Sequence, residues 1–405
     1  MEHLSIKNFL CIEEAEFEVG RFNIIIGSQA SGKSVISKLL YFFREIYDSN
    51  HSQPLSSSKK SLQTIIPNNF KRYFPEYAWK KQSFQIDYEI NNIKISLIND
   101  EGLSLLLSDE FISLNAELKK INQEKLSNLE NAILKEQQLK KRLGIFQSLL
   151  FIPATRSFFA IVQKNIFSFL ANDIEIDPFL KKFGSLYENA KMLFSEHEHV
   201  VANSKLDSEF YPINIDLRDK ISFLIELILK GSYFRKDEQD WIKTKEQTIN
   251  FFHASSGQQE SLPMLIILSV WVALVDRQAS KIFIEEPEAH LFPVSQKHII
   301  SLLGVIYNHS YDFVITTHSP YILTAINNAI LAHDVIEEKG KEAVKDIFDP
   351  DFAIKYEDVK AYTIENGRLI SIMDDEARLI GASVIDSVSD EFETVFDNLL
   401  DLQDE

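Results

Sequence analysis

The sequence FNIIIGSQASGKS, residues 22–34, places a compact apolar run directly before a glycine-containing loop. The apolar run, residues 22–26, is typical of a buried parallel strand. The loop has the spacing G-x-x-x-x-G-K-[ST], in which glycine lets several backbone N–H groups point at one phosphate. It consists of Gly27, Ser28, Gln29, Ala30, Ser31, Gly32, Lys33 and Ser34.

This loop predicts a site for ATP and Mg²⁺. Lys33 is expected to bind the outer phosphates, and Ser34 is expected to give its hydroxyl group to the metal. The segment after Ser34, VISKLLYFFREIY, has helical spacing, and the N-terminus of such a helix adds its dipole to anion binding. The motif requires a strand before it and a helix after it, and the sequence predicts both. The sequence therefore predicts an α/β fold of the P-loop class.

A second apolar strand, residues 282–284, ends in two adjacent carboxylates, Glu285 and Glu286. Successive side chains of a strand point to opposite faces, so the two acids are expected to have different tasks. A Mg²⁺ site needs one carboxylate, and attack on the γ-phosphate needs a group that orients water. We therefore predict that Glu285 is a metal ligand and that Glu286 is the catalytic residue that polarises water.

Two further segments carry polar groups that suit a nucleotide. Residues 312–315 predict another buried strand, followed by His318, which can donate a hydrogen bond to the γ-phosphate. Ser256 and Gly257 open an apolar helix, and the free N–H groups and dipole at its start favour an anion. For this second segment a plain helix N-cap is the alternative interpretation.

Charge is unevenly distributed along the chain, whose formal net charge is -18. Residues 374–405 hold eleven acidic residues against the single base Arg378, which accounts for about half of the excess. The acidic balance argues against nucleic acid as a general partner. Basic clusters in the first half are explained by solvated helix faces, and DNA contact stays an open alternative. These clusters lie at residues 59–60, 71–72, 80–81 and 140–142.

The sequence favours a cytoplasmic protein with no membrane partner. A single cysteine, Cys11, excludes an internal disulfide framework and a cysteine-based zinc site. The charges throughout residues 1–19 do not fit a signal peptide. The longest uncharged apolar run, residues 262–275, is too short to cross a bilayer and predicts a buried helix.

The pattern of elements predicts two hairpins and several helices. Alternating residues predict one hairpin at 84–99 with its turn at Asn91-Asn92, and a second one at 359–373 with its turn at Asn366-Gly367. Residues 109–142 contain no Gly or Pro and predict either one helix about 50 Å long or a bent pair. Residues 158–248 are expected to be mainly helical.

In this order, the motifs resemble those of ABC-type ATPases. They are similar to SMC/Rad50 heads and more closely to the OLD-like AAA ATPases of bacteria, which include the stand-alone anti-phage ATPases PtuA of Septu and AriA of PARIS. The resemblance rests on IKNF, GSQASGKS, FIPATRS, ASSGQQE, FIEEPEAHLFP and ITTHSPY. It implies an ABC-type head with an N-terminal antiparallel β subdomain, a central β core and helical insertions that include a short coiled-coil-like segment.

The chain is accordingly expected to divide into five segments. The first would carry the phosphate loop, the second a β hairpin with a helical insertion, and the third a helical lobe. The fourth would complete the ATPase head, and the fifth would hold a β hairpin and an acidic C-terminal helix. The boundaries are 1–45, 46–148, 149–250, 251–350 and 351–405.

The resemblance also implies roles for single residues. The loop from Gly27 to Ser34 corresponds to Walker A, Glu285 and Glu286 to Walker B, and His318 to the switch histidine. Residues 288–292 stand in the place of the D-loop and residues 155–157 in that of the Q-loop. The signature motif corresponds to residues 255–259, in which Ser256 and Gly257 would touch the γ-phosphate bound by a second subunit. Glu285 replaces the usual aspartate, and Gln258 replaces a glycine.

The function that this resemblance implies is that of a slow ATPase subunit in a bacterial anti-phage complex. Such heads pair around ATP as a homodimer or higher oligomer and control a separate effector, often a nuclease. About 85 residues follow His318, fewer than a usual domain, and they lack a Glu followed by an Asp-x-Asp strand, so no nuclease centre is expected on this chain. The alternative is an SMC/Rad50-like DNA-binding clamp in DNA repair, against which the shortness of the segment 109–142 argues.

Overall fold

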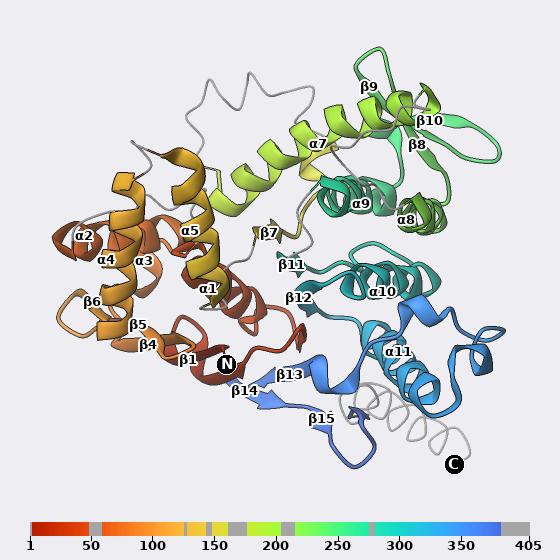
Figure 1. Cartoon of the computed structure of the whole chain (residues 1–405). Helices are drawn as coiled ribbons and strands as arrows, with labels where there is room; N and C mark the ends of the chain where they lie inside the picture. The colour runs from red at the N-terminus through yellow and green to blue at the C-terminus, as the bar shows by residue number, and fades with distance from the viewer. Residues whose placement is uncertain are drawn as a thin grey trace, which may run out of the picture.

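A computed structural model describes the chain at residues 2–47, 59–124, 128–142, 148–160, 176–203, 215–274 and 280–381. Within these residues, eleven strands form one mixed sheet that runs through the whole molecule (Figure 1). Its strands are β1 (Glu2–Phe9), β2 (Ile12–Glu18), β3 (Phe22–Ile26), β4 (Phe84–Ile90), β5 (Ile93–Asn99), β6 (Leu103–Leu107), β7 (Ser148–Ile152), β11 (Ser280–Glu285), β12 (Tyr311–Thr317), β13 (Val359–Glu365) and β14 (Arg368–Ser371).

The sheet has a parallel half and an antiparallel half. Its order is β6-β5-β4-β1-β2-β14-β13-β3-β12-β11-β7. Strands β13, β3, β12, β11 and β7 are all mutually parallel, whereas β6, β5, β4, β1 and β2 pair antiparallel. The predicted α/β fold with an N-terminal antiparallel part and a central β core is therefore confirmed.

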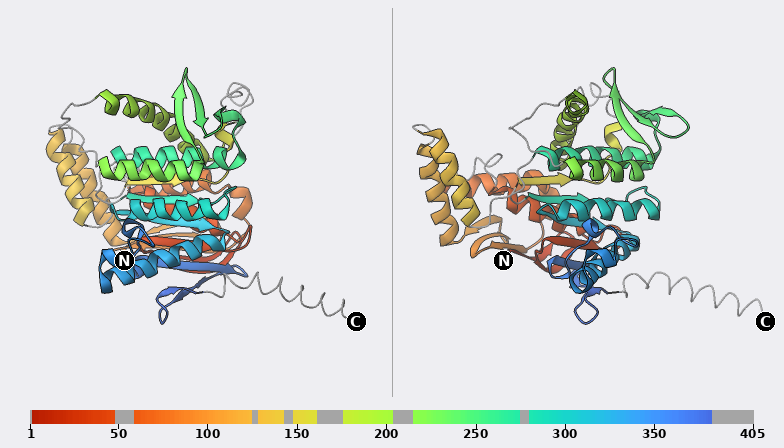
Figure 2. Two further views of the ribbon diagram at one scale, coloured as in Figure 1. Left: turned by 90° about the vertical axis from the view of Figure 1, so that its right-hand side faces the viewer. Right: turned by 45° about the vertical axis from the view of Figure 1, so that its right-hand side comes forward.

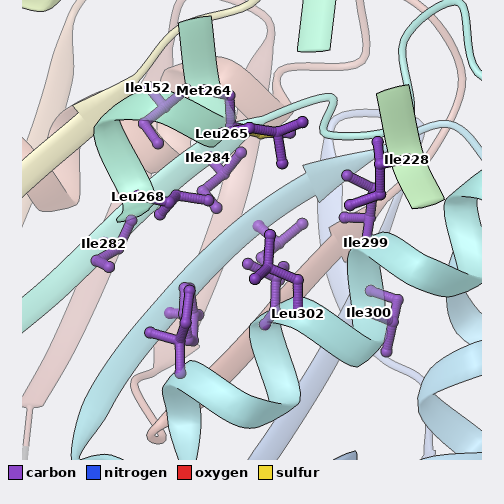
Figure 3. Packing of buried hydrophobic residues seen from close by; sticks show 14 of the residues in the cluster. Ile152, Ile228, Met264, Leu265, Leu268, Ile282, Ile284, Ile299, Ile300 and Leu302 are labelled. Carbon is purple, nitrogen blue, oxygen red and sulfur yellow. The ribbon is translucent and has the colours of Figure 1, made fainter. Parts of the chain in front are cut away.

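The parallel strands are apolar on both faces because helices cover both of them. On β3, the side chain of Ile25 belongs to one buried cluster and those of Ile24 and Ile26 to the other. Helix α1 (Lys33–Glu45) packs on the first face, against residues such as Phe283. The second face is covered by α9 (Ser256–Leu274), α10 (Pro293–Tyr307) and α11 (Pro320–Lys339). Figure 3 shows isoleucines and leucines of β7, β11, α9 and α10 meeting on this second face.

The insertion between β3 and β7 carries a short helical hairpin. The segment 109–142, predicted as one helix or a bent pair, forms two helices that lie side by side (Figures 1 and 2). Glu124 near the end of the first helix forms an ion pair with Lys135 on the second. Besides α1, the described helices between β3 and β7 are α2 (Lys59–Tyr73), α3 (Glu76–Trp79), α4 (Asp109–Glu124) and α5 (Leu129–Arg142).

The expectation that residues 158–248 are mainly helical is wrong for the last part of that range. Helices α7 (Pro178–Asn203) and α8 (Ile215–Leu229) are followed by a separate three-stranded sheet of β8 (Ser232–Lys236), β9 (Gln239–Lys243) and β10 (Thr248–Asn250). The turn between β8 and β9 is Asp237-Glu238, and both residues have positive φ, 52° and 60°. Such a turn usually contains Asn or Gly, so its sequence gave no hairpin signal.

The two predicted hairpins are present. Asn91 and Asn92 join β4 to β5 with φ of 48° and 68°, and Asn366 and Gly367 join β13 to β14 with φ of 49° and 76°. Positive φ at both central residues is the requirement of a type I′ turn, which asparagine and glycine meet at low cost. A small two-stranded sheet of β15 (Met373–Asp374) and β16 (Leu379–Ile380) follows. The expected acidic C-terminal helix lies outside the described residues.

The apolar run at residues 262–275 is a buried helix as far as the structure describes it. It forms most of α9, in which Leu262 and residues 264–268 are buried. Over the described part of the chain, no helix combines the length and the apolar character that crossing a membrane requires.

A cluster of buried charged residues lies at the edge of the sheet opposite to the carboxyl ends of its parallel strands. The Glu2 carboxylate accepts hydrogen bonds from Arg44 at 2.6 and 2.7 Å, from Lys281 at 2.8 Å and from the Tyr88 hydroxyl at 2.8 Å. Burial opposes ionisation of Glu2, but the charges of Arg44 and Lys281 outweigh it and hold the pKa of this carboxyl well below its usual range. The cluster joins β1, β4, β11 and α1.

Replacement of Glu2 by alanine is expected to lower the free energy of unfolding by about 3–5 kcal/mol, because it leaves two buried cations without their main counter-charge. Urea denaturation measures this loss. The matched control is Glu16→Ala on β2, whose side chain is 54% exposed and pairs with His3; it should cost less than about 1 kcal/mol. Since the folded-state pKa of Glu2 is depressed, its contribution is present at neutral pH and is lost as the pH falls below about 4. Equal losses in the two variants would contradict this role.

Candidate nucleotide site

The predicted site residues meet at one edge of the parallel sheet. Parallel register places the carboxyl ends of β3, β12, β11 and β7 side by side. The phosphate loop follows β3, Glu285 ends β11, and His318 follows β12. Ligands of open α/β sheets bind outside this edge, because the loops there can project side chains and N–H groups into one crevice.

The phosphate loop turns sharply between β3 and α1. Ala30 and Gly32 have positive φ, 62° and 108°. The φ of Gly32 would strain any residue with a side chain, and a Cβ atom there would also lie 2.4 Å from the Ile12 side chain and 3.0 Å from Cys11 Sγ. Gly32 precedes the first helical residue, Lys33, and its carbonyl oxygen accepts the N–H of Val35 and Ile36.

The Lys33 ammonium group lies beside the backbone carbonyl groups at the start of the phosphate loop. Its Nζ atom donates to the carbonyl oxygens of Gly27 at 2.9 Å and Ser28 at 2.8 Å. Burial lowers the pKa of Lys33, and the negative charges of Glu286 and Glu288 oppose this effect. The lysine is thus a partly desolvated cation held by two exchangeable carbonyl acceptors, which phosphate oxygens can replace.

His318 bridges Lys33 and Glu286. Its Nδ1 atom lies 3.3 Å from Lys33 Nζ, and its Nε2 atom lies 3.1 Å from Glu286 Oε1. An ammonium group can only donate and a carboxylate can only accept, so these contacts fit the tautomer in which Nδ1 accepts from Lys33 and Nε2 donates to Glu286. The contact with the Glu286 carboxylate places the His318 ring where it can orient this carboxylate. Both side chains are about one third exposed, 33% and 35%, so Glu286 can contact water.

Glu285 meets the requirements of a magnesium ligand. Its carboxylate is 4% exposed and accepts hydrogen bonds from the Ser34 hydroxyl and from the backbone N–H of Ala154. Burial raises its pKa, against the charge of Lys38 and these hydrogen bonds. Among the described residues its Oε1 atom has no hydrogen-bond partner. In Mg²⁺-nucleotide sites the protein typically supplies a serine hydroxyl and a carboxylate oxygen as metal ligands. Ser34 and Glu285 offer these two groups, so they fit Mg²⁺ bound with a nucleotide.

Glu288 is a third acid of the site, whose role the sequence reasoning missed. Its Oε1 atom accepts the Thr317 hydroxyl at 2.6 Å and the backbone N–H of His318 at 2.8 Å. It lies in the segment interpreted as the D-loop, and its hydrogen bonds fix the loop that carries His318. Spacing alone could not have placed it, because the two loops are 29 residues apart.

Arg156 is the second residue that the sequence reasoning missed. Its segment was placed only as the Q-loop position, but its guanidinium group is fully buried and donates to backbone carbonyls at the ends of β7 and β11. Burial lowers the pKa of Arg156, and the charge of Glu260, followed by those of the three glutamates on the β11 side, opposes the effect. The motif FIPATRS places an arginine directly after a buried strand, but the carbonyl acceptors of its guanidinium group include backbone atoms of distant segments that the motif does not reveal.

The signature residues open α9. Ser255 caps the helix, with its hydroxyl group 3.4 Å from the Gln258 N–H, and the Gln258 amide donates to the Leu229 carbonyl at 2.9 Å. The N-cap interpretation thus applies to Ser255. A Cβ atom on Gly257 would lie 2.7 Å from the His290 carbonyl oxygen, so this helix start touches the segment 288–292. None of the hydrogen bonds found in the described ranges joins Ser256, Gly257 or Gln258 to the phosphate loop, so their contact with nucleotide stays a prediction that needs a second subunit.

Comparison with known proteins gives one family match. A family model described as AAA domain, putative AbiEii toxin, Type IV TA system, matches residues 22–324, a range that runs from the strand before the phosphate loop into α11. No curated protein matches the chain.

Solved structures of SMC heads are similar to the chain over almost its full length. One is an SMC head bound to the C-winged helix domain of ScpA, with 14% identity, a TM-score of 0.44, and coverage of 93% of this chain and 98% of that one. The SMC head domain from Thermotoga maritima has 11% identity, a TM-score of 0.36, and coverage of 91% and 97%. The head from Pyrococcus furiosus, with an extended coiled coil and bound to the C-terminal domain of ScpA, has 12% identity, a TM-score of 0.41, and coverage of 96% and 100%.

Proposed function

The chain belongs to the family described as AAA domain, putative AbiEii toxin, Type IV TA system, and from this premise we propose that it binds ATP with Mg²⁺ and hydrolyses it slowly. The observation that carries the proposal is the chain of contacts from Lys33 through His318 to Glu286, beside the Ser34–Glu285 pair. These groups lie at one sheet edge in the order that phosphate binding, metal binding and water activation require.

Each residue has one task in this proposal. Lys33 and the N–H groups of the loop bind the outer phosphates, and Ser34 and Glu285 hold the metal. Mg²⁺, when bound, neutralises charge on the phosphates. Glu286 takes a proton from the attacking water, and His318 keeps its carboxylate in place. Glu288 holds the backbone of His318 at the position where its ring reaches both partners.

We further propose that two heads pair around the nucleotide, as a homodimer or within a higher oligomer. Large apolar side chains are exposed on the two helix starts that flank the site: Phe292 is 75% exposed, Val294 53% and Tyr321 55%. Exposed apolar side chains grouped beside polar functional residues are typical of interaction surfaces. Ser256 and Gly257 of one head would then contact the nucleotide held by Lys33 of the other.

The biological role that we propose is control of a separate effector, such as a nuclease, in an anti-phage complex. The support is the resemblance of six motifs to the stand-alone defence ATPases, spread from IKNF to ITTHSPY. The test is the mass of the complex recovered when the chain is expressed together with the product of its neighbouring gene, with and without ATP. A stable assembly that contains a second protein is the expected result.

A lone nucleotide-dependent dimer in that experiment would contradict the effector role. That result would favour the alternative function, an SMC/Rad50-like DNA-binding clamp. The next measurement would then be whether the chain binds DNA in a way that depends on ATP and on salt concentration. The described helices of the hairpin favour the effector role, because α4 and α5 have 16 and 14 residues and each spans only about 20–25 Å at 1.5 Å per residue.

A further inference from the structure

We propose that Arg156 and Glu260 are positioning residues that tie the catalytic Glu286 to the start of α9, so that hydrolysis in one subunit depends on the state of that subunit's own signature segment. The inference rests on the proposed ATPase function and deepens it. It assigns a coupling role to two buried residues, to which the proposed function gives no contact with nucleotide or metal.

The Arg156 guanidinium group is surrounded by backbone carbonyl oxygens. Nη1 donates to Pro153 at 2.9 Å and to Glu285 at 2.7 Å. Nη2 donates to Glu286 at 2.9 Å, and Nε donates to Glu260 at 2.9 Å. These acceptors lie at the end of β7, at the end of β11 and in the second turn of α9, so one planar group fixes three elements at once.

The contact with Glu286 stabilises a strained backbone. Glu286 has φ of 46°, in the left-handed region that residues with a side chain rarely adopt. Its N–H donates to Thr316 at 2.8 Å, and its carbonyl oxygen accepts from Arg156. A strained residue keeps its conformation only when its surroundings hold it. The direction of the Glu286 side chain therefore depends on the Arg156 hydrogen bond.

Glu260 fixes Arg156 in turn. Its two carboxylate oxygens accept the backbone N–H of Arg156 at 2.7 Å and of Ser157 at 2.8 Å. Glu260 is 2% exposed and Arg156 is 0% exposed, so neither charge is screened by water. Glu260 follows Ser256 by four residues on the same helix, which places both on one face of α9.

A displacement of the start of α9 would reach Glu286 through the hydrogen bonds between Glu260 and Arg156 and between Arg156 and Glu286. When the signature segment binds nucleotide on the partner head, the position of Glu260 changes together with the start of α9. Arg156 moves with Glu260, and its hydrogen bond carries the change in position to the Glu286 carbonyl. In a pair of heads each subunit activates its own Glu286 only when its own signature is engaged. Hydrolysis at the two sites should then be cooperative, with a Hill coefficient above 1.

The test compares Glu260→Gln and Arg156→Lys with the wild-type chain. Both variants are expected to keep nucleotide affinity within about threefold, because Lys33 and its loop are untouched. The kcat should fall by about 100-fold, the effect of misplacing a catalytic group by about 1 Å, and the Hill coefficient should fall to 1. Matched controls are Glu246→Gln and Arg72→Lys, whose side chains are exposed; both should hydrolyse ATP as the wild type does.

Retention of kcat and of cooperativity in Glu260→Gln would overturn the inference, as would a wild-type Hill coefficient of 1. If the variants fail to fold, amide hydrogen exchange in residues 153–158 of the wild-type protein tests the coupling instead. These amides should exchange more slowly with ATP than without it, in contrast to Lys33→Ala, and unchanged exchange would overturn the coupling. Absence of ATP hydrolysis by the wild type would instead refute the proposed function, which separates the two failures.

Discussion

Glu286→Gln is expected to lower ATP hydrolysis by about 10³-fold while leaving nucleotide binding intact. Glutamine has the same shape and can still accept the hydrogen bond from His318 Nε2, which lies 3.1 Å from the carboxylate. It lacks the negative charge that takes a proton from water. If the heads pair around ATP as proposed and separate after hydrolysis, the variant should accumulate as a closed dimer with ATP. Phosphate release and the mass of the complex with ATP measure the two effects.

The matched control for this variant is Glu89→Gln, an exposed glutamate on β4. It should hydrolyse ATP at the wild-type rate and should form no trapped dimer. Rapid turnover in Glu286→Gln would remove the role assigned to Glu286 and would leave Glu288, the other acid beside Lys33, as the group to test.

The parts of the site that the sequence predicted are those set by short-range rules. The loop at 27–34 and the strand before it occupy adjacent positions in the chain, so their spacing alone encodes the turn. Glu285, Glu286 and His318 follow buried strands, and parallel strands bring their carboxyl ends to one edge whatever the connections between them. The order of apolar runs was therefore enough to place these residues at one site.

The parts that the sequence reasoning missed depend on contacts between distant segments. Arg156 and Glu260 are 104 residues apart, and Glu288 and Thr317 are 29 apart. A single sequence contains no signal that a given arginine will find four carbonyl oxygens, because the acceptors are backbone atoms that every residue has. The sheet of β8–β10 was missed for a local reason, since the Asp237-Glu238 turn lacks asparagine and glycine.

Lys33→Ala is expected to abolish detectable nucleotide binding. The ammonium group now donates to two carbonyls of the loop, and it is predicted to exchange them for phosphate oxygens. A hydrogen bond to a charged group contributes about 1.5–3 kcal/mol, so losing two of them raises the Kd by at least about 100-fold. Titration with a fluorescent ATP analogue measures the loss, and the ATP-dependent dimer should disappear with it.

The control for this variant is Lys80→Ala, which removes an exposed lysine after α3 and should leave the Kd unchanged. Lys33 also faces Glu286 and Glu288, so its loss leaves Arg156 as the remaining cation that the structure shows interacting with both acids. The variant should therefore be less stable as well as unable to bind, and thermal unfolding would separate the two effects. Nucleotide binding at wild-type affinity in a folded Lys33→Ala protein would refute the assignment of the phosphate loop, on which the roles of Glu285, Glu286 and His318 depend.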